Sequence, residues 1–352
     1  MCRILKAIFR FIKRLFLFAL LLALIVGIIY ILPLFETADL QGITEDAEWM
    51  SMLPDSIPVN ELILPGTHNS ASEFAQLPFF TRCQGGDVGE QLRAGFRYLD
   101  IRLAVDSESD SLKFMHGFAS CQTAAKPDSP ALYLDAVLEE CYSFLEEHPY
   151  ETILFAVKQE HGSEPVSDFQ RILFNNYILL RYERWLLTDR IPNLGEARGK
   201  IVLLRRYEDE AGMGASAGIP FLWADQGAKS GEGLSAAENR NGSYSLIVQD
   251  RYAYSDEEKW AAFVTGLQSS EAEIRKGNIS LNFLSTKGSF PVGHPYDHAD
   301  TLNSTFRNRI QNINGWIIVD FGEPYIARMI YQMNFQLNSR EQSAVQIIDM
   351  PE

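Results

Sequence analysis

The stretch TILFAVK (152–158) contains five consecutive apolar residues, Ile153 to Val157, and ends at a lysine. A continuously apolar run of this length is typical of a parallel strand that is buried on both faces. Similar short runs recur along the chain at ELIL (61–64), RYLDIRL (97–103), LKFMHG (112–117), IVLLRR (201–206), LIVQD (246–250), ISLNFL (279–284) and WIIVDF (316–321). The chain therefore has eight candidate strands.

Amphipathic segments alternate with these runs and predict helices over residues 131–147, 166–188, 256–275, 303–313 and 323–337. Alternation of eight strands with helices over roughly 290 residues favours an α/β fold of the (β/α)8 barrel type. The gap between the second and third runs is too short for a helix, and residues 208–244 are Gly-rich and irregular. We therefore expect a distorted or incomplete barrel over residues 56–340, followed by a tail at 341–352.

Ionisable residues end seven of the eight runs. In chain order they are His68, Asp100, Arg102, His116, Lys158, Arg206, Asp250 and Asp320. Barrel enzymes carry their chemistry at the carboxyl ends of the strands, because all these ends meet at one mouth. Two histidines and two arginines in such a set favour an active site over a chance pattern of solvated strand ends.

These residue types suit the cleavage of a phosphodiester. Two histidines can act as a general base and a general acid, and an arginine between them matches the oxygens of a phosphate. Asp100 and Asp320 could fix the histidine tautomers. We predict no metal and no cofactor, because the carboxylates are scattered and Arg102 would place a fixed positive charge where a cation would bind.

A separate N-terminal segment precedes the barrel. Residues 15–35, LFLFALLLALIVGIIYILPLF, form 21 residues without a charge, which is long enough to cross a hydrocarbon core of about 30 Å. Five cations precede them, at Arg3, Lys6, Arg10, Lys13 and Arg14, and no small-residue cleavage pattern follows before Glu36. We expect a basic cytoplasmic segment (1–14), an uncleaved single-pass anchor (15–35) and a linker (36–55). The positive-inside rule then puts the barrel outside the cell membrane.

Composition and charge limit the partners. The 352 residues are 46% hydrophobic and 22% charged, which fits a folded globular protein, and the formal charge of −15 argues against nucleic acid. Without residues 1–36, which carry five cations and one anion, the remainder has a formal charge of −19. Anionic headgroups would repel this domain, so contact with lipid has to be apolar. Phe74, Leu77, Phe79 and Phe80 either pack beneath the first loop or form such an apolar lip.

Six segments together carry a resemblance to a known family. They are LPGTHNSAS (64–72), GFRYLDIRL (95–103), FMHG (114–117), GKIVLLRRY (199–207), VQDRY (248–252) and GWIIVDF (315–321). In this order the chain resembles the bacterial-type phosphatidylinositol-specific phospholipases C, the X-domain phosphodiesterase family, over residues 56–330. The resemblance implies a small distorted barrel that cleaves phosphatidylinositol to diacylglycerol and inositol cyclic phosphate.

The resemblance also implies a role for each strand-end residue. His68 would be the general base on the inositol 2-hydroxyl, Asp320 would orient it, and His116 would protonate the glycerol oxygen. Arg102 would hold the phosphate, with Asp100 bracing it. The positions that match inositol-binding residues of the family are Lys158, Arg206, Asp250 and Tyr252, with Tyr252 as the stacking face.

Asn69 departs from this pattern. The metal-independent bacterial enzymes have an aspartate after the first histidine, where it assists the acid. Calcium-dependent relatives have an asparagine there, but they have an acidic residue where this chain has Arg102. We therefore expect a metal-independent site in which Asn69 weakens the general acid.

Two further groups of residues are open to a second interpretation. The segment GHPYDHAD (293–300) contains His294 and His298 but matches no zinc motif, so we expect a solvated loop over the barrel mouth. Cys83 and Cys121 could form a disulfide outside the cell, whereas Cys141 lies at helical spacing and is expected to be a buried thiol.

Two functions from different classes remain open. The first is a membrane-anchored enzyme that cleaves phosphatidylinositol or a glycosylated inositol lipid. The second is a weak or inactive module that binds an inositol lipid or a sugar on the same barrel, which Asn69 would permit. A barrel phosphodiesterase for glycerophosphodiesters or sphingomyelin is disfavoured, because those enzymes use metal-binding carboxylates. The sequence leaves the oligomeric state open.

Overall fold

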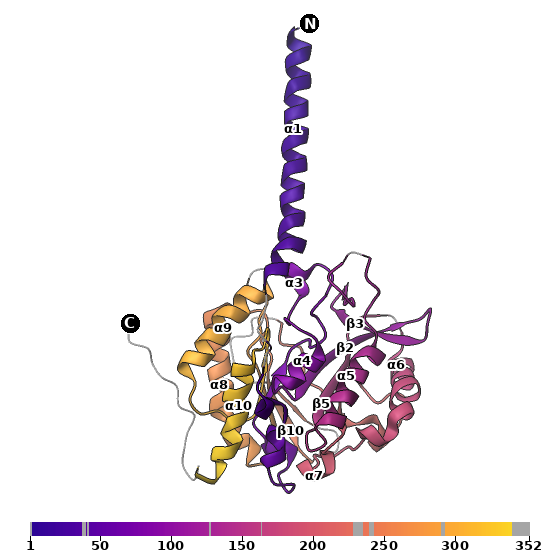
Figure 1. Cartoon of the computed structure of the whole chain (residues 1–352), viewed down its shortest axis with the longest axis vertical. Coiled ribbons are helices and arrows are strands. Elements are labelled where there is room, and N and C mark those ends of the chain that lie inside the picture. The colour runs from indigo at the N-terminus through magenta and orange to yellow at the C-terminus, as the bar shows by residue number, and fades with distance from the viewer. Residues whose placement is uncertain are drawn as a thin grey trace.

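The computed structural model describes residues 2–36, 40, 42–126, 128–162, 164–227, 235–238, 243–289 and 293–339. It shows a rounded α/β body from which one long helix, α1 (Cys2–Val26), projects (Figure 1). Within the body, helices surround the outside of a curled sheet, with α5 and α6 to the right and α8, α9 and α10 to the left of the strands (Figure 1).

The sheet follows the order β6-β7-β5-β2-β1-β12-β11-β10-β9, and β8 pairs with β7 at the same edge as β6. Its strands are β1 (Leu64–Thr67), β2 (Tyr98–Asp106), β5 (Ile153–Gln159), β6 (Trp185–Leu186), β7 (Ile201–Arg205), β8 (Ile219–Pro220), β9 (Ser235–Glu238), β10 (Ser245–Gln249), β11 (Ile279–Phe283) and β12 (Trp316–Val319). All neighbours are parallel except β9 and β10. Within the described residues β8 and β9 do not pair, so the barrel is open at this point, as the irregular segment 208–244 predicts.

The α-helices of the body follow the strands in a βα alternation. They are α2 (Thr44–Ala47), α3 (Pro78–Thr81), α4 (Val88–Arg93), α5 (Leu134–Glu147), α6 (Val166–Leu173), α7 (Leu194–Ala197), α8 (Asp256–Ile274), α9 (Pro295–Arg309) and α10 (Pro324–Tyr331). The predicted helix 166–188 is shorter than expected, because α6 passes into irregular turns (174–184) before β6.

One predicted barrel strand has a different place. The run 112–117 forms β3 (Ser111–His116), which pairs antiparallel with β2 and with the short β4 (Ala119–Ser120). The short connection after β2 permits a hairpin but no crossover helix, so β3 cannot be a parallel barrel strand. The hairpin nevertheless brings His116 over the barrel mouth.

The apolar strands are buried on both faces. On β5, Leu154 and Ala156 belong to an apolar cluster inside the barrel. The alternate residues Ile153, Phe155 and Val157 pack outward against α4, α5 and α6 as part of a second cluster. A third cluster joins the sheet to α8, α9 and α10. This double burial explains why the run 153–157 lacks a polar residue.

The sequence predicts a linker over residues 36–55, but the second half of this segment is packed against the barrel. Trp49 and Met50 are fully buried, and the Trp49 ring stacks on Tyr331 with centroids 5.1 Å apart. The indole of Trp49 also donates a hydrogen bond to the carbonyl of Gly95, at 3.0 Å. The chain therefore packs against the base of the barrel from about Thr44 onward, because Trp49, Met50 and Leu53 are buried in the apolar cluster inside the barrel.

The segment 293–300 also differs from the solvated loop that the sequence predicts. Residues from Pro295 onward form the first turns of α9, with Pro295 at the first helical position, where it needs no hydrogen-bond donor. His294 is buried and bonded to Phe79 and Glu36, and His298 pairs with Asp256 at 2.7 Å. The tail predicted at 341–352 lies outside the described residues.

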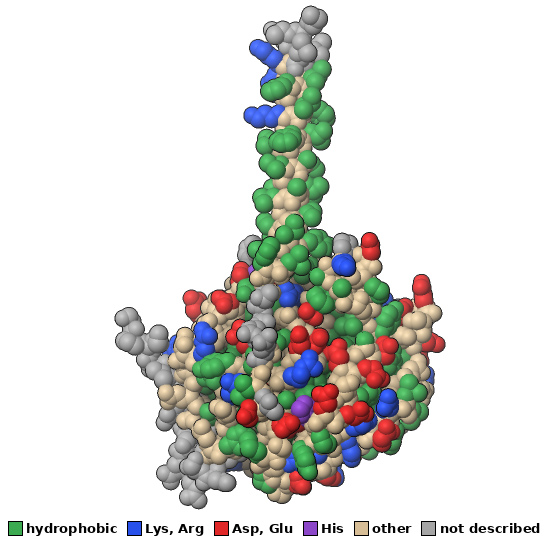
Figure 2. All heavy atoms as spheres, in the orientation of Figure 1, with side chains coloured by type: hydrophobic (Ala, Val, Ile, Leu, Met, Phe, Trp, Pro, Cys, Tyr) green, Lys and Arg blue, Asp and Glu red, His purple; other side chains and the backbone are tan. Residues whose placement is uncertain are grey.

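The N-terminal helix leaves the body as an exposed apolar rod. After α1, a π-helical turn (Gly27–Ile31) and a 3-10 turn (Leu32–Phe35) lead to the body. Residues Ile8–Phe35 are long and apolar enough to cross a membrane, and they are not buried in the fold. Figure 2 shows the rod covered by hydrophobic side chains, with basic residues toward its far end and acidic ones spread over the body.

The buried Trp49 side chain is expected to stabilise the folded body. Trp49→Ala should lower the free energy of unfolding of the detergent-solubilised full chain by about 3–5 kcal/mol, because it removes a fully buried ring. Urea denaturation followed by circular dichroism measures this difference. Met52→Ala is the control, since Met52 is 66% exposed and its loss should change stability by no more than about 0.5 kcal/mol. Equal urea midpoints for wild type and Trp49→Ala would contradict the packing of residues 44–53 against the barrel.

Candidate active site

The pairing of β1 with β12 brings the first two site residues together. Thr67 and Val319 are register partners, so the next residues, His68 and Asp320, leave the sheet side by side. The Nδ1 atom of His68 lies 2.7 Å from a carboxylate oxygen of Asp320. The Gln84 side chain donates to the carbonyl of His68 at 2.8 Å and so fixes its backbone.

Arg102 decides the tautomer of His68. Its Nη2 lies 2.7 Å from the Nε2 atom of His68. A guanidinium only donates hydrogen bonds, so Nε2 of His68 must accept with its lone pair and the ring proton must sit on Nδ1, facing Asp320. This neutral tautomer is the one that a general base requires. Its basic nitrogen is held against a permanent positive charge.

A buried carboxylate holds that arginine. Asp100 and Arg102 are two residues apart on β2 and therefore share a face of the sheet. Asp100 is fully buried and accepts hydrogen bonds from Nε of Arg102 at 2.9 Å, from Arg206 and from the backbone of Asn69 at 3.1 Å. Burial by itself would raise the pKa of Asp100, but the two arginines more than offset it and hold this pKa well below its usual range. The carboxylate is thus ionised at any physiological pH.

Glu160 is a member of this network that the sequence analysis missed. Its carboxylate accepts from Nη1 of Arg102 at 3.1 Å, from Lys158 at 2.5 Å and from the backbone of Gly117 at 3.1 Å. Burial opposes its charge, yet Arg102 and Lys158 lower its pKa well below the usual range. The alternation of side chains along β5 was the available signal, because Glu160 follows Lys158 by two residues and so lies on the same face.

His116 faces His68 from the end of the β3 hairpin. The two rings stand edge to face with centroids 6.0 Å apart. Nδ1 of His116 donates to the carbonyl of Thr81 at 2.6 Å, which leaves Nε2 for another partner. Burial, together with the positive charge of Arg102, lowers the pKa of His116 from 6.5 to about 4. The free protein therefore holds His116 neutral at pH 7.

The predicted ring-binding residues extend the network outward. The guanidinium of Arg206 stacks 3.7 Å from the centre of the Trp223 ring, and the indole of Trp223 donates to Asp250 at 3.1 Å. Tyr252 stands farther out, where its hydroxyl donates to Asp225 at 2.7 Å. Burial and this hydrogen bond raise the pKa of Tyr252 to about 12, so the phenol is neutral. Trp223, which sequence reasoning missed, thus connects two predicted residues.

Asn69 has a conformation that suits its residue type. Its φ is +46°, in the left-handed region that asparagine tolerates better than most residues. The side chain is buried, and its Nδ2 has no hydrogen-bond partner among the described residues. The hydrogen bonds of the structure tie its backbone to Asp100, and none of those described joins its side chain to His116.

His68, Cys83 and Asp320 bring three potential metal-ligand atoms within 4.8 Å of one another. They fit an ion poorly. The Nδ1 proton of His68 is used by Asp320, and Nε2 accepts from Arg102. Burial raises the pKa of the Cys83 thiol well above its usual value, so it stays protonated and ligates weakly. Cys83, Cys121 and Cys141 are all buried free thiols, so the predicted thiol at Cys141 is confirmed and the structure contains no Cys83–Cys121 disulfide.

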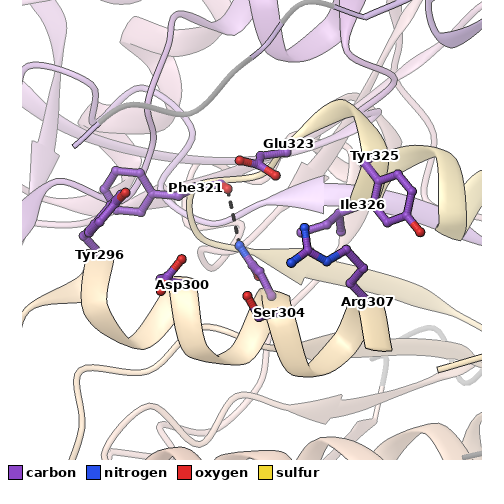
Figure 3. Close-up of a pocket in the computed structure, with 9 residues that line it drawn as sticks. Tyr296, Asp300, Ser304, Arg307, Phe321, Glu323, Tyr325 and Ile326 are labelled. Atoms are coloured by element: carbon purple, nitrogen blue, oxygen red, sulfur yellow. Dashed lines mark hydrogen bonds between the residues drawn. The ribbon is translucent and has the colours of Figure 1, made fainter. Parts of the chain in front are cut away.

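A small polar pocket of about 110 Å³ lies behind β12, between α9 and the start of α10 (Figure 3). It contains none of the predicted site residues. Its wall residue Asn303, however, donates to the carbonyls of Asp320 at 2.9 Å and of Phe321 at 3.3 Å. Asn303 thereby fixes the backbone that positions the partner of His68.

Comparisons with known proteins agree with this geometry. Residues 56–207 match the family model "Phosphatidylinositol-specific phospholipase C, X domain". A protein of Staphylococcus aureus named 1-phosphatidylinositol phosphodiesterase is 28% identical over 293 residues, which cover 78% of this chain and 87% of the relative. The protein of the same name from Listeria monocytogenes is 28% identical over 308 residues, covering 82% of this chain and 84% of the relative.

Solved structures support the fold. A phosphatidylinositol-specific phospholipase C of Staphylococcus aureus superposes with a TM-score of 0.67 at 24% identity, covering 82% of this chain and 98% of that one. The enzyme of Listeria monocytogenes superposes with a TM-score of 0.60 at 23% identity, covering 83% and 99%. The distorted barrel predicted from the sequence is therefore confirmed. Residues 56–207 thus match the phosphatidylinositol-specific phospholipase C X domain, and the chain as a whole resembles the bacterial-type members of that family.

Proposed function

We propose that this chain is a membrane-anchored, metal-independent phosphatidylinositol-specific phospholipase C. The observation that carries the proposal is the pair of opposed histidines with different environments, one bonded to a carboxylate and an arginine and the other held neutral beside them. Groups whose surroundings separate their proton affinities divide into acid and base. The substrate is phosphatidylinositol or a glycosylated inositol lipid.

The first step is an exchange of partners at Arg102. In the free protein Arg102 occupies the basic nitrogen of His68. A phosphate monoanion is a better acceptor for a guanidinium than a neutral imidazole is, since that bond is charge-assisted. Binding of the substrate phosphate would draw Nη2 of Arg102 away and free Nε2 of His68. Nε2 then takes the proton of the inositol 2-hydroxyl, and Asp320 stabilises the resulting imidazolium.

The second step transfers a proton at His116. The inositol 2-oxygen forms a bond to phosphorus while the bond from phosphorus to the glycerol oxygen breaks. Nε2 of the protonated His116 gives its proton to that oxygen, so diacylglycerol and inositol cyclic phosphate leave. His68 has gained one proton and His116 has lost one, and water restores both. Arg102 stabilises the negative charge on the phosphate oxygens.

The outer residues bind the inositol ring in this proposal. Asp250 and Lys158 offer an acceptor and a donor to its hydroxyls, Arg206 lies between them, and the neutral Tyr252 provides a stacking face. The unpartnered amide of Asn69 is a further buried donor beside the phosphate position.

Residues 15–35 anchor the enzyme in a single pass, and the barrel of residues 56–340 acts outside the cell membrane. The exposed apolar rod Ile8–Phe35 and its preceding cations support this arrangement. The acidic body needs such a tether, because anionic lipid does not attract it.

One observation favours the second candidate, an inositol-lipid binding module. With a pKa lowered to about 4, His116 is neutral at pH 7 in the free protein and cannot act as an acid there. Asn69 adds no negative charge to help. The enzyme therefore depends on the substrate phosphate to charge its own acid, and a chain that fails at this step would bind lipid without cleaving it.

Histidine variants test the assignment of base and acid. His68→Ala and His116→Ala should each lower turnover of phosphatidylinositol by about 10²–10⁴-fold. On an inositol phosphate ester with a phenolic leaving group, His116→Ala should lose much less, because that leaving group needs no proton. His68→Ala should lose equally on both substrates. Equal losses for His116→Ala on both substrates would remove it from the role of acid.

Titration of His116 tests how the acid is charged. NMR of ¹³C-labelled histidine in the full chain should give a pKa near 4 for His116 without ligand, so that most His116 rings carry a charge only below that pH. Inositol cyclic phosphate should raise this pKa, because a negative phosphate favours the imidazolium. A pKa near 6.5 without ligand, or no rise with it, would contradict the proposed step. His298→Gln, which removes a histidine paired with Asp256, helps to assign the resonances.

Protease treatment of intact cells tests the orientation. Protease added outside should degrade the body, while an epitope tag fused to the N-terminus, before residues 1–14, should remain protected. A body that is cut only after lysis would reverse the proposed topology.

A further inference from the structure

A second and larger pocket lies outside the catalytic cluster, where the N-terminal rod meets the body. Its volume is about 740 Å³, within the range of about 300–1,000 Å³ typical of ligand sites. The rod contributes Val26, Tyr30, Pro33 and Leu34, and the body contributes residues 73–78 together with Gln122, Ala125 and Lys126. Figure 1 shows α3 at the foot of the rod, which locates this junction. Most of the lining is apolar.

The junction is fixed by specific contacts. The buried guanidinium of Arg82 donates to the carbonyls of Pro33 at 2.6 Å and Glu36 at 2.9 Å. The side chain of Glu36 is bonded to Nε2 of His294 at 2.7 Å, and the His294 ring stacks on Phe79 with centroids 4.0 Å apart. These bonds hold the foot of the rod beside residues 74–80, so the pocket has defined walls. Phe74, Leu77, Phe79 and Phe80, for which the sequence left open packing beneath the first loop or an apolar lip, are half-buried beside the foot of the rod.

The same wall is continuous with the general acid. Ala75 bridges to Cys121, Gln122 donates to the carbonyl of Phe74 at 3.0 Å, and Gln76 donates to that of Ser120 at 2.9 Å. Ser120 pairs with Met115 in the hairpin that ends at His116. Thr81, at the end of α3, accepts the hydrogen bond from His116. The pocket wall is therefore linked through the hairpin to His116, on whose side the glycerol oxygen and its acyl chains would depart in the proposed mechanism.

We propose that this pocket binds an acyl chain of the diacyl inositol lipid, so that the membrane anchor is also part of the substrate site. The inference rests on the proposed function above. Three observations select a lipid chain as the occupant. The pocket wall is mostly apolar, it is formed in part by the segment that is apolar enough to cross a membrane, and backbone hydrogen bonds join it to the hairpin that carries His116. A chain drawn from the surrounding leaflet would pass into the pocket without crossing water.

Photo-crosslinking tests the proposal without relying on catalysis. The full chain with His68→Ala, which should not cleave substrate, is reconstituted into phosphatidylcholine vesicles containing phosphatidylinositol with a diazirine in one acyl chain. After illumination, peptide mass spectrometry should find adducts on residues 73–78 and 122–126 as well as on the rod. Adducts confined to residues 8–25, with none on the body, would overturn the proposal.

A space-filling variant provides the matched comparison. Ala125 is exposed at the pocket wall, so Ala125→Trp should fold normally and lower labelling of residues 73–78 about tenfold, with labelling of residues 8–25 as the internal standard. Ala215→Trp, at an exposed alanine that does not line the pocket, should leave the labelling unchanged. Undiminished labelling in Ala125→Trp would overturn the proposal.

The two proposals can fail separately. In the chain with His68 intact, Ala125→Trp should lower kcat/KM on vesicle phosphatidylinositol about tenfold more than on an inositol phosphate ester without acyl chains. Equal effects on both substrates would contradict the acyl site while leaving the catalytic proposal in place. If neither substrate is cleaved even by the wild type, the catalytic proposal falls, and the crosslinking result alone decides whether the pocket binds lipid.

Discussion

The active site depends on one buried carboxylate. Asp100 is fully buried near the start of β2, and a charge there is tolerable only with strong partners, which Arg102 and Arg206 supply. This pairing fixes the guanidinium of Arg102 against Nε2 of His68. The tautomer of His68, its bond to Asp320 and the position available for a phosphate all follow. Removing Asp100 would leave two partly buried arginines without compensation, so the site would lose its geometry as well as a charge.

The same arginine separates the two histidines. His68 has a carboxylate behind it and can accept a proton, whereas the part-buried His116 lies near the charge of Arg102 and is bonded to the Thr81 carbonyl and to the Cys83 thiol, with no carboxylate at its ring. Glu160 limits this effect, since it neutralises part of the charge of Arg102 and Lys158. In the proposed mechanism the site would be inactive until the substrate phosphate binds. The phosphate would release the base from Arg102 and also favour the charged form of the acid.

The sequence predicted the parts that are set by local pattern. The apolar run 153–157 is a doubly buried strand, and His68 and Asp320 directly follow two strand ends and meet Arg102, although β2 continues beyond Arg102 to Asp106. The failures have tertiary causes. The run 112–117 has strand character, but its antiparallel pairing follows from a short connection. Trp49 lies in a segment without clear periodicity, and only the core beneath the barrel explains its burial. Glu160 was within reach through the alternation on β5, whereas the role of Asn303 depends on a contact between distant elements.

The N-terminal rod and the candidate site are structurally connected, because Arg82 and His294 hold the foot of the rod beside the wall that supports His116. In the proposed mechanism Arg102, and no metal, provides the positive charge for cleavage. Phosphorus NMR of the purified full chain with phosphatidylinositol vesicles and excess EDTA tests it most directly. The phosphorus signal of inositol cyclic phosphate should grow at the same rate with and without chelator. Product that appears only after calcium is added, or no product under either condition, would contradict it.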